Sequence, residues 1–256
     1  MKTTEPRVGV MLPAYNEEAP LPLVLEELPR DLCARVVVVD NASTDRTAEV
    51  ARAAGAEVVY EARRGYGQAC LTGIARLLTE ESEAGAAPLQ SGDVIVFLDA
   101  DHSDYPEELP LVLAPILEGR ADMVIGSRVL GGAGMDALLP QARFGNLLAC
   151  FLMRILFGAR YTDLGPFRAI RVEALERLSM VDTDFGWTVE MQLKAASFGL
   201  AVEEVPVRYR KRIGSSKITG TLRGTFHAGW KILGWITVWR VRLFFARKES
   251  PRSPRS

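Results

Sequence analysis

The sequence predicts an α/β fold built around a mostly parallel β-sheet. Short runs of β-branched residues alternate with segments of helical pattern, which is the order that parallel sheets require. These runs are apolar almost throughout, as is typical of strands that are covered on both faces. The chain has 256 residues, 48% of them hydrophobic and 25% charged, enough for one large domain or two small ones.

The predicted elements follow one another regularly through the first half of the chain. The predicted strands are 8–12, 35–40, 56–60, 94–99, 122–127 and, later, 201–207. The predicted helices are 17–28, 44–54, 67–81, 106–118, 144–157 and 187–198. A long helix over about 221–246 and a tail, 247–256, complete the prediction. The tail is rich in Ser, Pro and Arg, a composition typical of disordered segments.

The net charge of −1 conceals an uneven distribution. Residues 207–256 hold 13 Lys and Arg and a single acidic residue, Glu249, whereas residues 1–206 hold 18 basic and 31 acidic residues. A basic end of this kind predicts an anionic partner: a phosphate, a membrane surface or a nucleic acid. The sequence shows no face that combines aromatic and basic residues, so we expect no nucleic-acid partner.

Features that the sequence lacks disfavour secreted, membrane-spanning and His-ligated metal proteins. Cys33, Cys70 and Cys150 form neither a CxxC motif nor an even set, which indicates reduced thiols in a cytoplasmic protein. The first residues have no apolar signal region. The two most apolar segments, 144–159 and 232–246, contain Arg and fall short of the roughly 20 residues that a spanning helix needs. Two distant histidines make a His-based metal site improbable.

Acidic residues gather where the predicted strands end. "PAYNEE" follows the first strand, "DNASTD" the second and "DADHSD" the fourth. Ligands of open parallel sheets bind beyond these carboxyl ends, so Glu17, Asp40, Asp45, Asp99 and Asp101 are candidate binding residues. None of the turns reads GxGxxG, which removes the main support for a dinucleotide-dependent hydride transfer.

Asp99 and Asp101 point to a cation. In an extended backbone their side chains point the same way, roughly 7 Å apart. Each charge disfavours the other unless a cation lies nearby. Oxygen ligands with open positions suit Mg²⁺ or Mn²⁺, which would also hold a diphosphate. The alternative is that Asp101 caps the helix near residue 105 and Asp99 only ends a strand.

Three basic motifs accompany the acidic ones. "EARRGYGQA" (61–69) offers backbone N–H groups and Arg63 or Arg64 to a phosphate or a base, although surface turns often have this composition. "GSR" places Arg128 at the end of the fifth strand. "YRKRIGSSK" (209–217) surrounds a flexible Gly with basic residues, either to neutralise a leaving diphosphate or as a solvated loop.

Taken in order with "TDLGPFR" (162–168), these motifs resemble the family 2 glycosyltransferases, and within them the dolichyl-phosphate mannose and glucose synthases. The resemblance spans roughly residues 8–220. It implies a GT-A fold over 1–220, with a nucleotide-binding half at about 7–128 and an acceptor half at about 129–220. It also implies that a hexose passes with inversion from a UDP- or GDP-linked donor, with Mg²⁺ or Mn²⁺ as cofactor.

The resemblance also assigns roles to residues by position. The residues implied to bind the nucleotide sugar are Pro13, Ala14, Tyr15, Glu17, Asp40, Asp99, Ala100, Asp101, Arg128, Lys211, Arg212 and Lys217. The residues implied to lie at the metal are Asp99, Asp101, as the main ligand, and Ser103. The residues implied in catalysis are Asp101, Arg128, Asp163, Arg168, Glu190, Arg212 and Lys217.

The acceptor stays open at this point. The resemblance favours a polyprenyl-phosphate lipid, which is already an anion and needs no strong base. A soluble or polysaccharide hydroxyl would need one, and Asp163 and Glu190 are then the candidates. A catalytically inactive protein that only binds nucleotide sugars is the third reading. "LGPFR" replaces a Thr-Gly pair of the family with Gly165-Pro166, and "DNAS" stands where "DDGS" is more usual.

Two apolar segments indicate where in the cell the protein works. Segments 144–157 and 221–246 combine Leu, Phe and Trp with Arg and Lys, a composition that suits an anionic membrane surface. They suit the protein's own core or a homodimer partner equally well. We expect a cytoplasmic protein, peripheral on the inner face of the membrane if the acceptor is a lipid. The C-terminal pair of membrane-spanning helices found in some relatives is not expected here.

Overall fold

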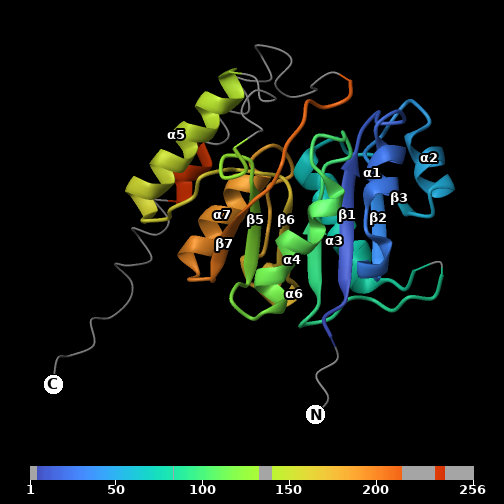
Figure 1. Cartoon of the computed structure of the whole chain (residues 1–256), viewed down its shortest axis with the longest axis horizontal. Helices are drawn as coiled ribbons and strands as arrows, with labels where there is room; N and C mark the ends of the chain where they lie inside the picture. The colour runs from blue at the N-terminus through green and yellow to red at the C-terminus, as the bar shows by residue number, and fades with distance from the viewer. Residues whose placement is uncertain (1–4, 83, 133–139, 215–233, 240–256) are drawn as a thin grey trace.

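A seven-stranded sheet lies at the centre of the molecule, with helices on both faces (Figure 1). The computed structural model describes residues 5–82, 84–132, 140–214 and 234–239. The strands are β1 (Val8–Ala14), β2 (Arg35–Asp40), β3 (Glu57–Tyr60), β4 (Val94–Phe97), β5 (Met123–Ser127), β6 (Arg168–Arg171) and β7 (Val202–Pro206). Their order across the sheet is β3-β2-β1-β4-β6-β5-β7.

The sheet is mostly parallel, as predicted. β1 pairs in parallel with β2 and β4, β2 with β3, and β5 with β7. β6 runs antiparallel between β4 and β5 and was not predicted. Its four residues, "RAIR", include two arginines and so lack the apolar run that marked the other strands. Arg168 is nevertheless fully buried within it.

The predicted helices are present, most with shorter bounds and the one predicted over 144–157 with longer ones, since it begins four residues earlier than predicted. They are α1 (Leu21–Glu27), α2 (Thr47–Ala53), α3 (Tyr66–Thr79), α4 (Leu109–Leu117), α5 (Pro140–Phe157) and α7 (Trp187–Ser197). An additional helix, α6 (Val172–Leu178), and two 3₁₀ turns, η1 (Arg30–Leu32) and η2 (Pro106–Glu108), were not predicted. Of the helix expected over 221–246, residues 234–239 are described and are helical. The rest of it, and the tail 247–256, lie outside the described residues.

Both faces of the sheet are buried, which explains the continuous apolar runs. On β1, Val10 and Leu12 belong to one core cluster with residues of α1 and α4. Met11, between them, belongs to a second cluster with residues of α3. Gly73 permits the close approach of α3, because a Cβ there would lie 2.3 Å from the Met11 side chain. Successive residues of the strand are therefore all apolar, because each face of the sheet packs against its own core cluster.

A third, smaller cluster lies away from the sheet. It joins Met153 of α5, Val189 and Leu193 of α7, and Ile236 of the 234–239 helix. Figure 1 shows this short helix beside α5. Within the described parts of the chain, no helix is long and apolar enough to cross a membrane.

Candidate active site

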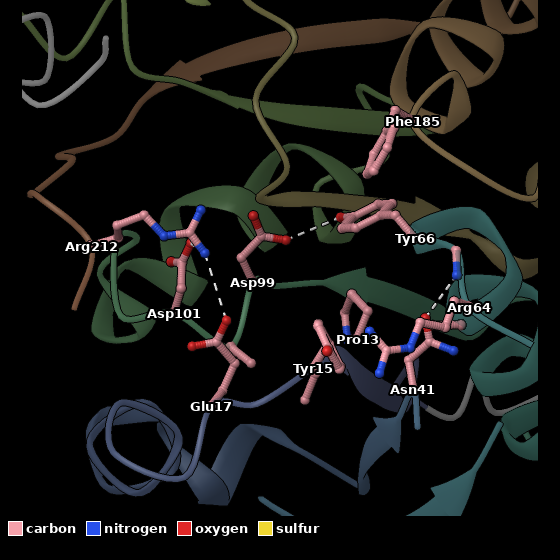
Figure 2. A pocket seen from close by; sticks show the side chains of 14 residues that line it. Pro13, Tyr15, Glu17, Asn41, Arg64, Tyr66, Asp99, Asp101, Phe185 and Arg212 are labelled. Atoms are coloured by element: carbon pink, nitrogen blue, oxygen red, sulfur yellow. Dashed lines mark hydrogen bonds and ion pairs between the residues drawn. The ribbon is translucent and has the colours of Figure 1, made fainter. Parts of the chain in front are cut away.

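A cavity of about 280 Å³ opens at the carboxyl edge of β1, β2 and β4 (Figure 2). Parallel strands that end together leave backbone groups and side chains free at one edge, where ligands of such sheets bind. The residues that line it are Pro13, Ala14, Tyr15, Glu17, Asn41, Arg64, Gly65, Tyr66, Ala69, Asp99, Ala100, Asp101, Phe185 and Arg212. Eight of these were predicted by the resemblance; Asp40, beside Asn41, is not among them.

One side of the cavity is flat and aromatic. The Arg64 guanidinium stacks on the Tyr15 ring, with 3.8 Å between its central carbon and the ring centroid. Figure 2 shows Tyr66 and Phe185 together on another wall. Flat aromatic and guanidinium faces bind the π-face of a nucleobase, whatever the base. These two walls therefore suit the base of a nucleotide.

The other side of the cavity is acidic. Asp99 Oδ1 accepts a hydrogen bond from the Tyr66 hydroxyl at 3.1 Å, and Asp101 Oδ1 accepts one from the Ser103 amide at 2.9 Å. Arg212 Nη2 lies 2.9 Å from Asp101 Oδ2 and 3.6 Å from Glu17 Oε1. Burial, and then the charge of Asp101, raise the pKa of Asp99 to about 7. Arg212 thus pairs with two of the three carboxylates of this group.

The oxygen atoms on this side of the cavity fit Mg²⁺ or Mn²⁺ as ligands. Both carboxylate oxygens of Asp104 are buried beside Asp99 and Asp101 with no hydrogen-bond partner in the described part of the chain, and Ser103 lies buried next to them. Burial and the two neighbouring carboxylates raise the pKa of Asp104. Among the described residues, no group of three His, Cys, Asp or Glu side chains forms a complete cage. Mg²⁺ and similar ions commonly bind one or two carboxylates plus substrate phosphates, so this partial oxygen set fits.

Arg212 reaches the site because its loop is fastened to the "DADHSD" turn. The Arg210 amide donates to the Ser103 carbonyl at 2.9 Å and the Ile213 amide to the Asp101 carbonyl at 3.1 Å. Arg208 and Arg210 also stack on the Tyr105 ring, 4.1 and 4.2 Å from its centroid. The structure thus brings together two predicted motifs about 110 residues apart. Lys211 is exposed, and Lys217 lies outside the described residues.

The glycine-rich turn has a different role from the one predicted. A Cβ on Gly65 would lie 2.1 Å from the Thr183 carbonyl oxygen, and one on Gly67 2.1 Å from that of Asp182. The amides of Gly67 and Gln68 donate to the carbonyls of this 182–184 segment. Both glycines therefore let that segment pack on the start of α3. The prediction that these amides meet a phosphate is wrong, whereas Arg64 does reach the cavity.

Asn41 connects the turn to the end of β2. Its amide nitrogen donates to the carbonyls of Glu61 and Arg63 at 3.1 and 2.7 Å, and its oxygen accepts from the Gly65 amide at 2.9 Å. A carboxylate could not donate to those two carbonyls. This explains the departure from "DDGS". Asp40, implied by the resemblance to bind the nucleotide sugar, accepts a hydrogen bond from the Ser43 amide at 2.9 Å, and its binding role stays a prediction.

Beyond the cavity, Arg128 and Asp163 form a buried ion pair. Arg128 Nε and Nη2 donate to the two carboxylate oxygens of Asp163, both at 2.7 Å, and the Arg128 amide donates as well. The Asp163 side chain is fully buried. Burial lowers the pKa of Arg128, but its hydrogen bonds to Asp163 and the charge of that carboxylate raise the pKa overall. Neither residue lines the cavity.

Arg168 and Glu190 are also held inside the protein. The Arg168 guanidinium donates to the carbonyls of Leu164, Gly165 and Thr188, and burial lowers its pKa to about 10. Glu190 accepts from the amides of residues 181 and 182 and pairs with Lys194 at 2.7 Å. Both side chains thus shape loops rather than face the cavity. Their predicted catalytic roles stay predictions.

The fold is that of a GT-A protein, and comparison with known proteins gives the family. The model of glycosyl transferase family 2 matches residues 9–179, so the chain belongs to that family. An uncharacterised glycosyltransferase of Mycobacterium tuberculosis is 36% identical over 231 residues, 88% of this chain and 97% of its own length.

Two relatives with named activities are also similar. The undecaprenyl-phosphate mannosyltransferase of Micrococcus luteus is 33% identical over 231 residues, covering 85% of this chain and 90% of its own. The dolichyl-phosphate hexose transferase of Haloferax volcanii is 34% identical over 214 residues, covering 82% and 86%.

Solved structures share the fold. Glucosyl-3-phosphoglycerate synthase of M. tuberculosis, crystallised with Mn²⁺, UDP and phosphoglyceric acid, has a TM-score of 0.70 over 97% of this chain and 80% of its own, at 22% identity. Its complex with Mn²⁺, UDP-glucose and phosphoglyceric acid has a TM-score of 0.69 over 92% of this chain and 80% of its own, also at 22% identity.

Proposed function

We propose that this glycosyltransferase moves a hexose, with inversion, from a UDP- or GDP-linked donor to a polyprenyl-phosphate-type lipid. The observation that carries the proposal is the state of the two carboxylates predicted as bases. Asp163 is enclosed by Arg128, and Glu190 by Lys194 and two backbone amides. A hydroxyl acceptor needs a group to take its proton, whereas a phosphate anion needs none.

The donor would lie in the cavity, with residues 7–128 as the nucleotide half and 129–220 as the acceptor half. Its base fits between the wall of Tyr15 and Arg64 and the wall of Tyr66 and Phe185. Its ribose and diphosphate would then lie over Asp99 and Asp101. Arg212 is within reach of that acidic side and would compensate the negative charge that develops on the departing diphosphate.

Asp101, with Asp99 and Ser103, would hold Mg²⁺ or Mn²⁺, and the unpartnered oxygens of this turn support that assignment. When bound, the ion supplies positive charge for the diphosphate as it leaves. The protein's own contribution is to present the carboxylates on one turn and to keep Arg212 beside them. The acceptor anion would attack the anomeric carbon from the opposite face.

Arg128 is the cation that this proposal places nearest to the acceptor. It lies at the end of β5, and its guanidinium is 5.0 Å from the centroid of the Tyr209 ring. The pair with Asp163 fixes its position. Two polyprenyl-phosphate hexosyltransferases among the relatives support a lipid phosphate as the acceptor. A lipid substrate in turn favours a protein that works at a membrane surface.

A soluble phosphorylated acceptor is the second candidate. It is favoured by the fold shared with glucosyl-3-phosphoglycerate synthase, whose structure contains phosphoglyceric acid. A protein that binds the donor without transfer is the third candidate. Neither of these requires a membrane.

The test combines donor binding with transfer. We expect one of UDP and GDP to raise the melting temperature with Mn²⁺ and much less without it. Asp101→Ala should remove the Mn²⁺-dependent part, and the exposed Asp31→Ala should not. The matching nucleotide sugar should then label a polyprenyl phosphate. Labelling of phosphoglycerate alone would support the second candidate, and binding without any transfer the third.

A further inference from the structure

α5 carries an apolar stripe on its outer side. Four large side chains are between 57% and 68% exposed: Phe144, Leu147, Phe151 and Ile155. Steps of three and four residues place them on one face of the helix, along roughly 16 Å. Water-exposed Leu or Phe residues are ordinary when single, but a continuous row marks a contact surface.

The opposite side of α5 faces the protein. Ala149 and Met153 belong to the third core cluster with residues of α7 and the 234–239 helix. Asn146 donates to the Thr162 carbonyl at 3.2 Å and accepts from the Leu164 amide at 2.8 Å. These residues flank Asp163, the partner of Arg128. The helix thus joins the outer stripe to the loop that positions the acceptor-side arginine.

The charged residues of the segment that carries the stripe are all basic. Residues 137–162 contain no Asp or Glu, and their charged residues are Arg143, Arg154 and Arg160. Arg154 and Arg160 are exposed. Figure 1 shows α5 at the outer edge of the molecule, at the end of the sheet away from α2. An apolar row on a segment whose charged residues are all basic complements a surface of acyl chains beneath anionic headgroups.

A second copy of the chain complements this surface poorly. If two stripes packed antiparallel and in register, Arg143 of one copy would lie close to Arg154 of the other. If they packed parallel, the two Arg154 side chains would meet. Either arrangement sets like charges beside an apolar contact, which disfavours it. An anionic membrane presents negative charge to Arg143 and Arg154 whichever way the helix lies on it.

We propose that the outer face of α5 docks on an anionic membrane, with the apolar row inserted between the headgroups. The proposal deepens the proposed function and rests on it for its purpose, because it would bring a lipid phosphate to the side of the protein that holds Arg128. The surface itself can be tested without any transfer reaction.

The first experiment measures binding of the full chain to vesicles by sedimentation. We expect binding to vesicles rich in phosphatidylglycerol and little binding to phosphatidylcholine alone. The double variant Leu147→Gln, Phe151→Gln should bind about tenfold more weakly or worse, because two inserted apolar side chains are lost. The matched control is Leu111→Gln, Leu117→Gln, which alters two similarly exposed leucines of α4 and should bind like the wild type.

Two further measurements make the outcome decisive. Nucleotide-dependent stabilisation should be the same in all three proteins, which shows that fold and donor site are intact. Equal vesicle binding by the α5 variant, or no binding by the wild type, overturns the proposal. A wild-type dimer that the α5 variant alone converts to monomer also overturns it, because a second copy then covers the face.

A transfer assay separates this proposal from the proposed function. With an active enzyme, the α5 variant should lose transfer to a long-chain polyprenyl phosphate in vesicles and keep transfer to a short, water-soluble analogue. If the wild type binds vesicles through α5 but transfers to neither, the surface stands and the polyprenyl-phosphate acceptor is wrong. If transfer occurs and the α5 variant is unaffected in both binding and vesicle assays, the surface is wrong.

Discussion

The side of this protein proposed to bind the donor and the side proposed to bind the acceptor, here called the donor side and the acceptor side, treat buried charge in opposite ways. At the donor side, Glu17, Asp99 and Asp101 face a cavity, and Arg212 pairs with Glu17 and Asp101. At the acceptor side, Asp163 and Glu190 each have a dedicated cation inside the protein. A motif shows that a carboxylate is present, but its counter-charge decides whether it can serve a ligand. Among the described residues, the buried carboxylate oxygens without a hydrogen-bond partner, those of Asp104, lie at the donor side.

The sharpest way to break this comparison is to remove an acceptor-side carboxylate. Asp163→Asn would leave Arg128 buried without its counter-ion, and we expect a loss of about 3–5 kcal/mol in the free energy of unfolding. Urea denaturation measures it. Glu107→Gln, which removes an exposed partner of Arg208, is the control and should cost less than about 1 kcal/mol. A stable Asp163→Asn protein that has lost turnover would show that Asp163 acts directly in the reaction.

Arg212 tests the donor side. Arg212→Ala should lower kcat by about a hundredfold, because a positive group beside the leaving diphosphate is lost from the transition state. Affinity for the nucleotide should change less, since the base wall is untouched. Arg212→Lys should restore part of the rate. Steady-state kinetics with calorimetry of nucleotide binding separates the two effects. A fall in affinity as large as the fall in kcat would make Arg212 a ground-state binding residue.

Much of the fold could be predicted because its signal is local. Continuous apolar runs marked β1, β2, β4 and β5, since strands buried on both faces need apolar residues at every position. β6 escaped, because its sequence, RAIR, has an arginine at each end and looks polar, although it pairs antiparallel between β4 and β5. The Arg168 guanidinium donates to the nearby carbonyls of Leu164 and Gly165 and to that of Thr188, 20 residues away, a contact that no local pattern contains.

The site divides in the same way. Acidic residues at strand ends, such as Glu17, Asp99 and Asp101, were predicted because topology brings strand ends together, whereas Pro13 and Tyr15 were predicted by the resemblance. Tyr66 and Phe185 were missed as lining residues. Tyr66 stood inside a motif interpreted only through its glycines and arginines. Phe185 lies in a loop whose position depends on packing against Gly65 and Gly67, and no strand end marks it.

Asn41 offers a smaller test of the cavity wall. Asn41→Asp should cost about 1–3 kcal/mol of stability, because the carbonyls of Glu61 and Arg63 lose their donor. It should also weaken nucleotide binding, since the 61–65 turn carries Arg64. Thermal unfolding with and without nucleotide measures both. An unchanged protein would mean that water replaces the amide, and that Arg64 is positioned by its stacking on Tyr15 alone.

The smallest expected effect concerns the pH dependence of the same wall. Burial would raise the pKa of Glu61, but hydrogen bonds from Thr72, the Arg63 amide and Gln68 outweigh it and lower the pKa from 4.5 to about 2. A lowered folded-state pKa means that the carboxylate stabilises the fold above pH 4.5 and loses this contribution as the pH falls toward 2.

Glu61→Gln should therefore cost about 1–2 kcal/mol at neutral pH and flatten the acid limb of the stability curve, because the wild-type contribution disappears there and the variant has none to lose. Exposed Glu26→Gln is the control and should leave the curve unchanged. Urea denaturation across the acid range measures the slope. Parallel curves for wild type and Glu61→Gln would show that Glu61 holds the turn by its shape and hydrogen bonds instead of its charge. Glu61 would then resemble Asn41, which holds the same turn without a charge.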